Sequence, residues 1–238
     1  YKKDIFIEKT IKSILNQTYQ NFEIILINDE ISEKSLNIVS NILNLDKRIK
    51  LIKNKENLGA GESRNKAIEK AEGEYIAFCD CDDLWKPSKL EIQINFMKNL
   101  NLNFCYTAYD IIDENDEVIS SRKAEEFINF EKLKKSCDIG LSTVLIKKEI
   151  FNDGKYKFPK LITKEDYVLW MTMAKNNIKM MGINQKLTCW RKTKNSLSSS
   201  TFQKLLDGYK VYRVYLGYGR FKSIFCLLSL SINFILKN

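Results

Sequence analysis

Phe78-Cys79-Asp80-Cys81-Asp82-Asp83 is the segment from which the rest of this sequence is best understood. It follows Glu74-Tyr75-Ile76-Ala77, a short apolar run that is typical of a buried strand. Aspartates clustered at a strand end concentrate negative charge, which is unfavourable unless a cation or hydrogen-bond donors meet it. Such oxygen ligands suit Mg²⁺ or Mn²⁺, which commonly also hold a substrate's phosphates. An acidic turn before the next helix is the alternative that these residues alone leave open.

Strands and helices are predicted to alternate at short spacing around this segment. Apolar spacing predicts helices over about 6–15, 32–44 and 62–71, and apolar runs predict strands at 22–27, 49–52 and 74–79. This alternation is typical of an α/β fold with a mostly parallel sheet and helices on its faces. Ligands of such sheets bind beyond the carboxyl ends of the strands, where we expect Asn28-Asp29, the loop 57–61 and the aspartates.

The second half of the chain is less regular. Strands are expected at 104–109, 141–146 and 187–191, a hairpin at 111–119, and helices around 90–97 and from 167 onward. The region of about 103–163 carries no interpretable motif.

Composition excludes several kinds of site. The 238 residues contain no histidine, so a Ser-His-Asp triad, a histidine-ligated zinc and a histidine base are excluded. The net charge of +9 indicates an anionic partner, such as a nucleotide, a nucleic acid or an acidic membrane surface. The lysines are scattered and are not clustered with aromatic residues, so we do not expect a nucleic acid. The six cysteines form no Cys-x-x-Cys pair and are expected to be reduced in a cytoplasmic protein.

The most specific feature is an ordered set of segments. These are Ser13-Ile14-Leu15-Asn16-Gln17-Thr18-Tyr19, Phe22-Glu23-Ile24-Ile25-Leu26-Ile27-Asn28-Asp29, Asn57-Leu58-Gly59-Ala60-Gly61, Ser63-Arg64-Asn65, Gly73-Glu74-Tyr75-Ile76-Ala77-Phe78 leading into Asp80-Cys81-Asp82-Asp83, Lys164-Glu165-Asp166-Tyr167, and Trp190-Arg191 with Asn195-Ser196-Leu197-Ser198. Together they resemble a family 2 glycosyltransferase of the GT-A fold, of the bacterial surface-polysaccharide type. The resemblance covers about residues 1–200, and the ordered set is far more specific than a lone DxD pair.

The resemblance implies a nucleotide-sugar site. Asp80 and Asp82 match the DxD pair, which reaches the ribose and the divalent metal, Mn²⁺ or Mg²⁺, on the diphosphate. Asp29 matches an acid that contacts the nucleotide base, and Arg64 matches a residue beside that pocket. Arg191 is expected to meet the diphosphate, with a solvated charge at a strand end as the alternative.

The resemblance also implies a catalytic pair. Asp166 matches the general base, and Glu165 is its expected neighbour in acceptor binding. The implied reaction is an inverting transfer from a nucleotide sugar, most simply a UDP-sugar, to a hydroxyl of a glycan or lipid-linked acceptor in surface polysaccharide or lipooligosaccharide synthesis. Alternatively, the two acids only favour the N-terminus of a helix through its dipole.

Two departures from the family pattern weaken this interpretation. The usual acidic pair followed by Gly-Ser reads Asn28-Asp29-Glu30-Ile31 here. Tyr1, a nucleotide-binding candidate, corresponds to the tyrosine of a Pro-x-Tyr-Asn-like turn after the family's first strand, and Lys2 takes the Asn position. We therefore expect a fragment with strand edges exposed on both sides of a gap. A nucleotidyltransferase and a degenerate, non-catalytic relative remain as alternatives.

The chain divides into a predicted GT-A domain, 1–200, and a helical segment, 201–238. Within the domain, 1–100 is the expected nucleotide-sugar half and 101–200 the acceptor half. In the C-terminal segment an apolar run of about 14 residues is too short for the ~20 that span a bilayer. A narrow polar stripe follows helical spacing: Lys222, Cys226, Ser229 and Asn233. The segment is expected either to bind the cytoplasmic face of the inner membrane or to pack on the catalytic domain or a dimer partner.

Overall fold

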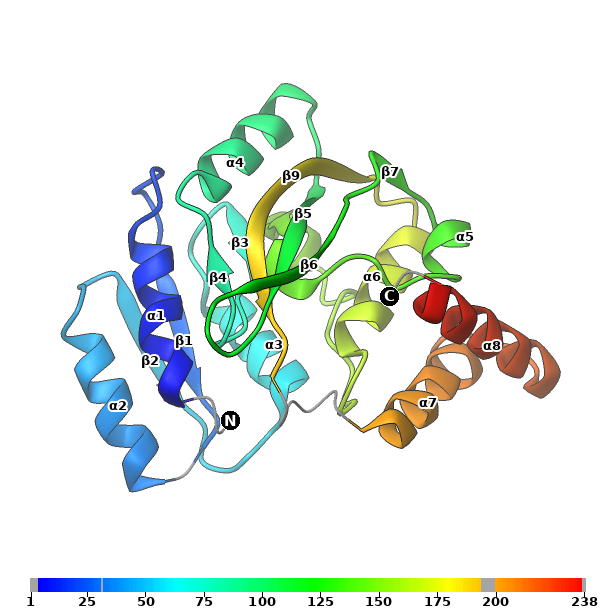
Figure 1. The fold of residues 1–238 in the computed structure, drawn as a ribbon, viewed down its shortest axis with the longest axis horizontal. Coiled ribbons are helices and arrows are strands. Elements are labelled where there is room, and N and C mark those ends of the chain that lie inside the picture. The colour runs from blue at the N-terminus through cyan, green and yellow to red at the C-terminus, as the bar shows by residue number, and fades with distance from the viewer. Residues whose placement is uncertain (1–3, 31, 194–199, 237–238) are drawn as a thin grey trace.

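A computed structural model describes residues 4–30, 32–193 and 200–236 and shows a mixed α/β fold (Figure 1). The N-terminal part contains α1 (Asp4–Leu15), β1 (Ile24–Asn28), α2 (Glu33–Leu43), β2 (Ile49–Lys53), α3 (Ala60–Lys70), β3 (Tyr75–Ala77), β4 (Leu84–Trp85) and α4 (Lys89–Asn99). The remainder contains β5 (Phe104–Ile112), β6 (Val118–Arg122), β7 (Phe127–Ile128), α5 (Phe130–Leu133), η1 (Leu141–Thr143), β8 (Leu145–Lys147), η2 (Lys148–Phe151), α6 (Glu165–Lys175), β9 (Met180–Arg191), α7 (Thr201–Lys210), η4 (Val211–Tyr215) and α8 (Arg220–Leu236).

The strands form two sheets. β1 and β2 pair in parallel, and the larger sheet has the order β3-β8-β5-β9-β4, with β6 beside β5 and β7 beside β9. Within the described residues of the larger sheet, β5 and β9 pair in parallel and every other pairing is antiparallel. The α/β prediction is confirmed, but the expected mostly parallel pairing is wrong for this sheet. One reason is that short turns, such as the one between β5 and β6, can join only antiparallel strands.

Most expected elements are present with shifted ends. The strand predicted at 187–191 is the last part of β9, which already begins at Met180, and the run predicted at 141–146 starts with a 3₁₀ turn before β8. β4 and β7 are two residues long, and sequence periodicity did not predict them. A pair of residues is too short to show an alternating pattern, so only pairing with β9 defines these strands.

A gap separates β1 from β3. Within the described chain, β1 pairs with β2 and β3 pairs with β8, so each strand has a second edge that no strand covers. Both strands line one cavity of about 1790 Å³, to which α1 and α3 also contribute. Strand edges on both sides of a gap match the expectation from the sequence.

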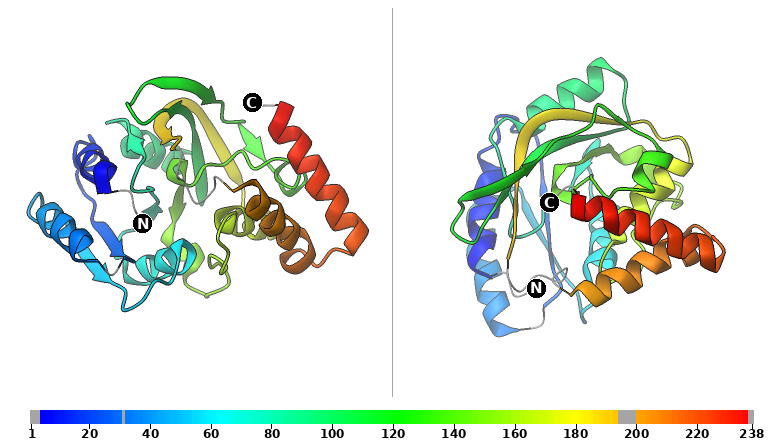
Figure 2. Two further views of the ribbon diagram at one scale, coloured as in Figure 1. Left: turned by 60° about the horizontal axis from the view of Figure 1, so that its bottom comes forward. Right: turned by 45° about the vertical axis from the view of Figure 1, so that its right-hand side comes forward.

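The C-terminal helices α7 and α8 pack beside each other at one edge of the molecule (Figure 2). Among residues 4–30, 32–193 and 200–236, no helix combines the length and apolar character needed to cross a bilayer. The helices α7 and α8 confirm the helical segment that was expected at the C-terminal end of the fold.

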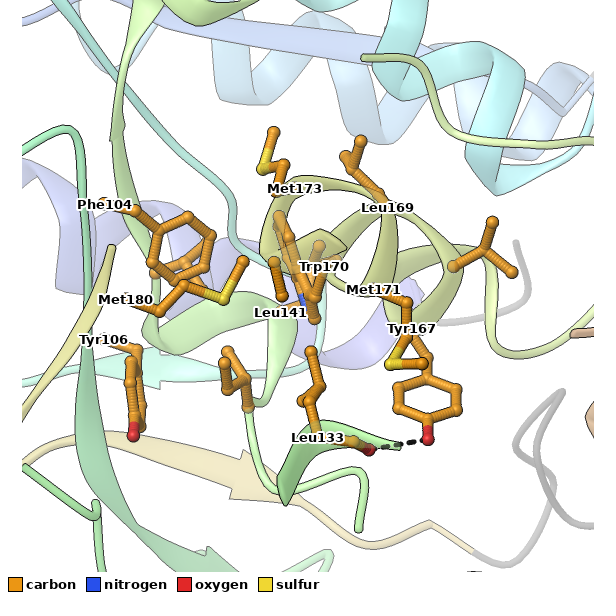
Figure 3. Packing of buried hydrophobic residues seen from close by; sticks show 14 of the residues in the cluster. Phe104, Tyr106, Leu133, Leu141, Tyr167, Leu169, Trp170, Met171, Met173 and Met180 are labelled. Atoms are coloured by element: carbon orange, nitrogen blue, oxygen red, sulfur yellow. Dashed lines mark hydrogen bonds between the residues drawn. The ribbon is translucent and has the colours of Figure 1, made fainter. Parts of the chain in front are cut away.

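A hydrophobic cluster fixes α6 from several sides (Figure 3). Trp170 is fully buried and makes edge-on ring contacts with Phe104 at 5.1 Å and Phe158 at 6.2 Å between centroids. Tyr167 is also buried, and its hydroxyl donates a 2.7 Å hydrogen bond to the Leu133 carbonyl. Because α6 is held this firmly, the side chains at its N-terminus have a fixed position in the molecule.

Candidate active site

The acidic segment after β3 folds into a tight turn. The Asp83 N–H donates to the Asp80 carbonyl at 3.0 Å. The Ser142 hydroxyl accepts from the Asp80 N–H at 3.0 Å and donates to Asp83 Oδ2 at 2.5 Å. This turn buries Asp82 and Asp83, whereas the Asp80 side chain is 39% exposed and lines the cavity. Burial raises the pKa of Asp83 well above its usual value, despite these hydrogen bonds.

Arg64 of α3 connects this turn with α6. One guanidinium nitrogen donates to Asp80 Oδ1 at 2.8 Å, and the other donates to Glu165 Oε1 at 2.5 Å. The guanidinium also lies 5.5 Å from the centroid of the Phe158 ring. The nearby negative charges outweigh burial and raise the pKa of Arg64. One side chain therefore joins three motifs that are far apart in the sequence.

Glu165 and Asp166 form the first turn of α6, where the helix dipole favours negative charge. The carboxylate of Asp166 accepts from the Tyr167 N–H at 2.7 Å. Burial, followed by the charge of Glu165, raises the pKa of Asp166 to about 7, against the opposing effect of Arg64. A carboxyl group with this pKa is suited to exchange a proton at neutral pH.

Asp29, at the end of β1, holds the loop that precedes α3. Its carboxylate accepts from Asn54 Nδ2 and the Leu58 N–H, both at 2.8 Å, and from the Gly59 N–H at 2.9 Å. Gly59 has φ 82°, a conformation that side chains disfavour. Asp29 also lines the cavity. Its expected contact with a nucleotide base stays a prediction.

Arg191 lies behind the acidic turn instead of facing the cavity. Its side chain is 0% exposed and donates to the carbonyls of Asp82 and Asp113, both at 2.8 Å. Its backbone N–H donates to Asp83 Oδ1 at 2.9 Å, and its guanidinium lies 4.4 Å from the Phe6 ring centroid. A diphosphate could reach Arg191 only if these bonds were broken. The structure therefore gives Arg191 a positioning role for the turn, and it does not support the expected diphosphate contact or a solvated charge.

Asp80 and Asp82 are the residues that could hold a divalent cation. The described residues contain no group of three or more histidine, cysteine, aspartate or glutamate side chains that could hold a metal ion. Asp80 lines the cavity and could give an ion such as Mg²⁺ one carboxylate, with further ligands from water and substrate phosphates. Asp82 is buried, so its expected share in the site stays a prediction. Tyr1 and the segment 195–198 lie outside the described residues, so their expected roles stay predictions.

Three positioning residues were not recognised from the sequence. Ser142 and Asp83 shape the acidic turn, as described above. Asn65 exchanges two hydrogen bonds with the Phe158 backbone, at 3.0 Å to its carbonyl and 2.9 Å from its N–H. Asn65 and Asp83 lie inside the quoted motifs, which was a usable signal, whereas nothing in the sequence near Ser142 indicated its role.

Comparison with known proteins decides the family. The family described as "Glycosyl transferase family 2" matches residues 1–154. This chain belongs to that family. The glycosyltransferase is also 36% identical over 207 residues to the Escherichia coli "UDP-Glc:alpha-D-GlcNAc-diphosphoundecaprenol beta-1,3-glucosyltransferase WfgD", covering 86% of this chain and 79% of WfgD. It is 30% identical over 238 residues to TuaG of Bacillus subtilis (strain 168), a glycosyltransferase named for teichuronic acid biosynthesis, covering 100% of this chain and 94% of TuaG.

Solved structures support the same fold. S. aureus TarS in complex with UDP-GlcNAc matches with a TM-score of 0.74 and 20% identity, covering 95% of this chain and 68% of that one. The mannosyltransferase PcManGT from Pyrobaculum calidifontis, in complex with GDP-Man and Mn2+, matches with a TM-score of 0.69 and 13% identity, covering 92% and 62%. The predicted GT-A fold and glycosyltransferase class are confirmed.

Proposed function

We propose that this glycosyltransferase transfers a sugar, with inversion, from a UDP-sugar to a hydroxyl of a glycan or lipid-linked acceptor in bacterial cell-surface polysaccharide or lipooligosaccharide synthesis. Two printed names support the proposal: WfgD names a UDP-glucose donor and a diphosphoundecaprenol acceptor, and TuaG is named for teichuronic acid. In this proposal residues 1–100 bind the donor, 101–200 the acceptor, and the enzyme acts at the cytoplasmic face of the inner membrane.

The bridge made by Arg64 is the observation that carries the proposal. The Arg64 guanidinium contacts both Asp80, which lines the cavity, and Glu165, which precedes Asp166 in the sequence. A donor beside Asp80 and an acceptor beside Asp166 would thus meet at one point. The alternatives, an acidic turn at 80–83 and a helix cap at Glu165-Asp166 without a shared function, would not require Arg64 to connect the two segments.

The residues at this point have distinct tasks in the proposed reaction. Asp166, with its pKa of about 7, accepts the proton of the acceptor hydroxyl as the hydroxyl attacks the anomeric carbon from the face opposite the leaving group. Glu165, held by Arg64, keeps negative charge beside Asp166 and so helps to raise its proton affinity. Asp29 and the loop 57–59 border the same cavity as Asp80, and Asp29 is proposed to contact the nucleotide base. Asp80 and Asp82 would hold a divalent cation, which would supply positive charge to stabilise the departing nucleoside diphosphate.

Donor binding tests the proposal directly. Thermal unfolding would be measured with UDP-, GDP- and dTDP-sugars, each with Mn²⁺ and with EDTA, alongside analysis of the released product. We expect a UDP-sugar to raise the unfolding temperature only with metal, and to release UDP. Release of pyrophosphate from a nucleoside triphosphate would instead indicate a nucleotidyltransferase. A folded protein that responds to no donor would contradict the proposal and favour a non-catalytic relative.

A further inference from the structure

Helix α8 turns its polar and small side chains toward the protein. Ser223, Cys226 and Leu230 are its buried residues, spaced three and four apart along one side of the helix. The Ser223 hydroxyl donates to the Gly219 carbonyl at 3.0 Å, so its polar group is satisfied locally. Asn233, farther along, donates to the Lys135 carbonyl at 3.0 Å. Leu230 belongs to the hydrophobic cluster of the domain and Leu227 packs against it, so the inner side of α8 combines polar and apolar contacts.

The opposite side of α8 presents large apolar side chains to the outside. We call it the outer face, and its members follow helical spacing: Phe221, Ile224, Phe225, Leu228, Ile232 and Ile235. Phe221 is 91% exposed and Phe225 is 73% exposed. A helix with its apolar stripe turned outward is unfavourable in water, so this face requires an apolar surface to cover it.

The charge around the outer face favours a lipid surface as the cover. Among the described residues from 200 to 236, the exposed Arg220 and Lys222 flank Phe221 on α8, whereas Lys204 and Lys210 lie on α7 and Arg213 on η4. The only acid among these described residues is Asp207, which is fully buried and bonded to Lys210. A second copy of this segment would offer apolar residues to the outer face but no exposed acid to Arg220 and Lys222, since Asp207 is buried. An anionic bilayer would instead bind both the apolar stripe and the basic side chains.

The arrangement of side chains on α8 agrees with a position in the plane of a membrane surface, because one side packs on the protein and the other is apolar and exposed. Helices of this kind lie in the plane of the interface, with the apolar face buried at the level of the head groups.

The helix pair is also tied to the catalytic helix. Asp207 of α7 accepts from the N–H and the hydroxyl of Thr163, both at 3.1 Å, two residues before Glu165. Lys164 packs close to α7, since a Cβ on Gly208 would lie 3.6 Å from its Cε. The pKa of Lys204 on α7 is lowered, mainly by burial and then by the nearby positive charges of Lys164 and Lys192. Positive charge thus extends from α7 toward Asp166.

We infer that the outer face of α8 and the basic residues beside it dock on an anionic phospholipid bilayer, which holds the N-terminus of α6 next to the membrane surface. The inference rests on the proposed function in one respect, because a lipid-linked acceptor would then reach Asp166 without leaving the bilayer.

Vesicle flotation tests the docking face. The probes are vesicles of phosphatidylcholine alone and vesicles that also contain phosphatidylglycerol. We expect the protein to float with the anionic vesicles. The double variant Phe221→Ser, Phe225→Ser should bind about 100-fold more weakly, because two exposed rings no longer enter the lipid. The variant Arg220→Gln, Lys222→Gln should bind the anionic vesicles about 30-fold more weakly, at ~1 kcal/mol for each charge.

Matched measurements make the outcomes decisive. Leu100→Ser, at an exposed apolar position at the end of α4, should float like the wild type. Equal binding by the Phe221/Phe225 variant would overturn the inference. The inference would also be overturned if the wild type floated with neither kind of vesicle but formed a dimer that the Phe221/Phe225 variant does not form. Flotation uses no donor, so Asp166→Asn should bind vesicles normally. A failure of the proposed transfer reaction is therefore distinguishable from a failure of docking.

Discussion

Two arginines contact the acidic turn, one from the cavity side and one from the buried side. The side chain of Arg64 is 18% exposed and pairs only with carboxylates, those of Asp80 and Glu165. Arg191 is 0% exposed; it donates to two backbone carbonyls and also forms an ion pair with Asp116 at 2.5 Å. Carboxylates beside a cavity can exchange their partner for a ligand, whereas backbone carbonyls in the interior cannot do so without unfolding. Similar residue types thus serve chemistry on one side of the turn and folding on the other.

The largest expected effect is that of Asp166→Asn on the cavity side. The variant keeps the shape of the side chain but cannot accept a proton, so we expect kcat to fall about 10³-fold. The pKa of Asp166 is raised from 3.8 to about 7 on folding, so its ionisation costs stability increasingly as pH rises through this window. The variant should therefore be at least as stable as the wild type at pH 8.

The measurements are turnover of a UDP-sugar and chemical unfolding at two pH values. Asp153→Asn, in an exposed loop, is the matched control and should change neither quantity. The wild-type rate should rise with pH through about 7, because only the deprotonated carboxylate is a base. Full turnover by the Asn variant would remove Asp166 from the mechanism.

Replacing each arginine by methionine compares the two sides directly. Arg191→Met leaves the Asp82 and Asp113 carbonyls without their donors and Asp116 without its ion-pair partner, so we expect a loss of about 3–5 kcal/mol in the free energy of unfolding. Arg64→Met should cost less stability. It removes a positive charge that lowers the pKa of Asp166, so the pH profile of turnover should move to higher pH.

Urea unfolding and pH–rate profiles of both variants check this pair. Two results would contradict the roles given to these arginines: a shift of the pH–rate profile of Arg191→Met to higher pH, or a larger loss in the free energy of unfolding for Arg64→Met than for Arg191→Met.

The smallest effects are expected for Gly59, just before α3, and Gly61, in the first turn of α3. A Cβ at Gly61 would lie 2.8 Å from the Pro159 carbonyl oxygen and 3.6 Å from Cγ of Glu165, so Gly61→Ala should displace the catalytic pair and lower kcat about 10-fold. Gly59→Ala meets no atom within 4 Å and should cost about 1–3 kcal/mol of stability, because φ 82° with ψ 167° is a conformation that essentially only glycine adopts. Turnover and urea unfolding of both variants separate the effects. A larger loss of kcat for Gly59→Ala than for Gly61→Ala would show that the backbone conformation at Gly59 affects catalysis more than the space beside Gly61.

Much of the cavity side was predictable from the sequence. Asp80, Arg64 and Asp166 were named from local motifs, and the structure brings their segments together. The buried side was not predictable, because the partners of Arg191 lie up to 109 residues away and are partly backbone carbonyls. A carbonyl is present at every position, so no residue type marks the one that an arginine will select.

Helix α8 shows the same division. The sequence by itself determined that its apolar and polar residues lie on opposite sides, because 3.6 residues per turn fixes which positions share a face. The tertiary structure alone decided that Ser223 and Cys226 face the domain while Phe221 and Phe225 face outward. Likewise, local spacing fixed the acidic turn, but the fold decided which of its carboxylates reaches the cavity. Local periodicity comes from backbone geometry, whereas the choice of buried face depends on packing against distant segments.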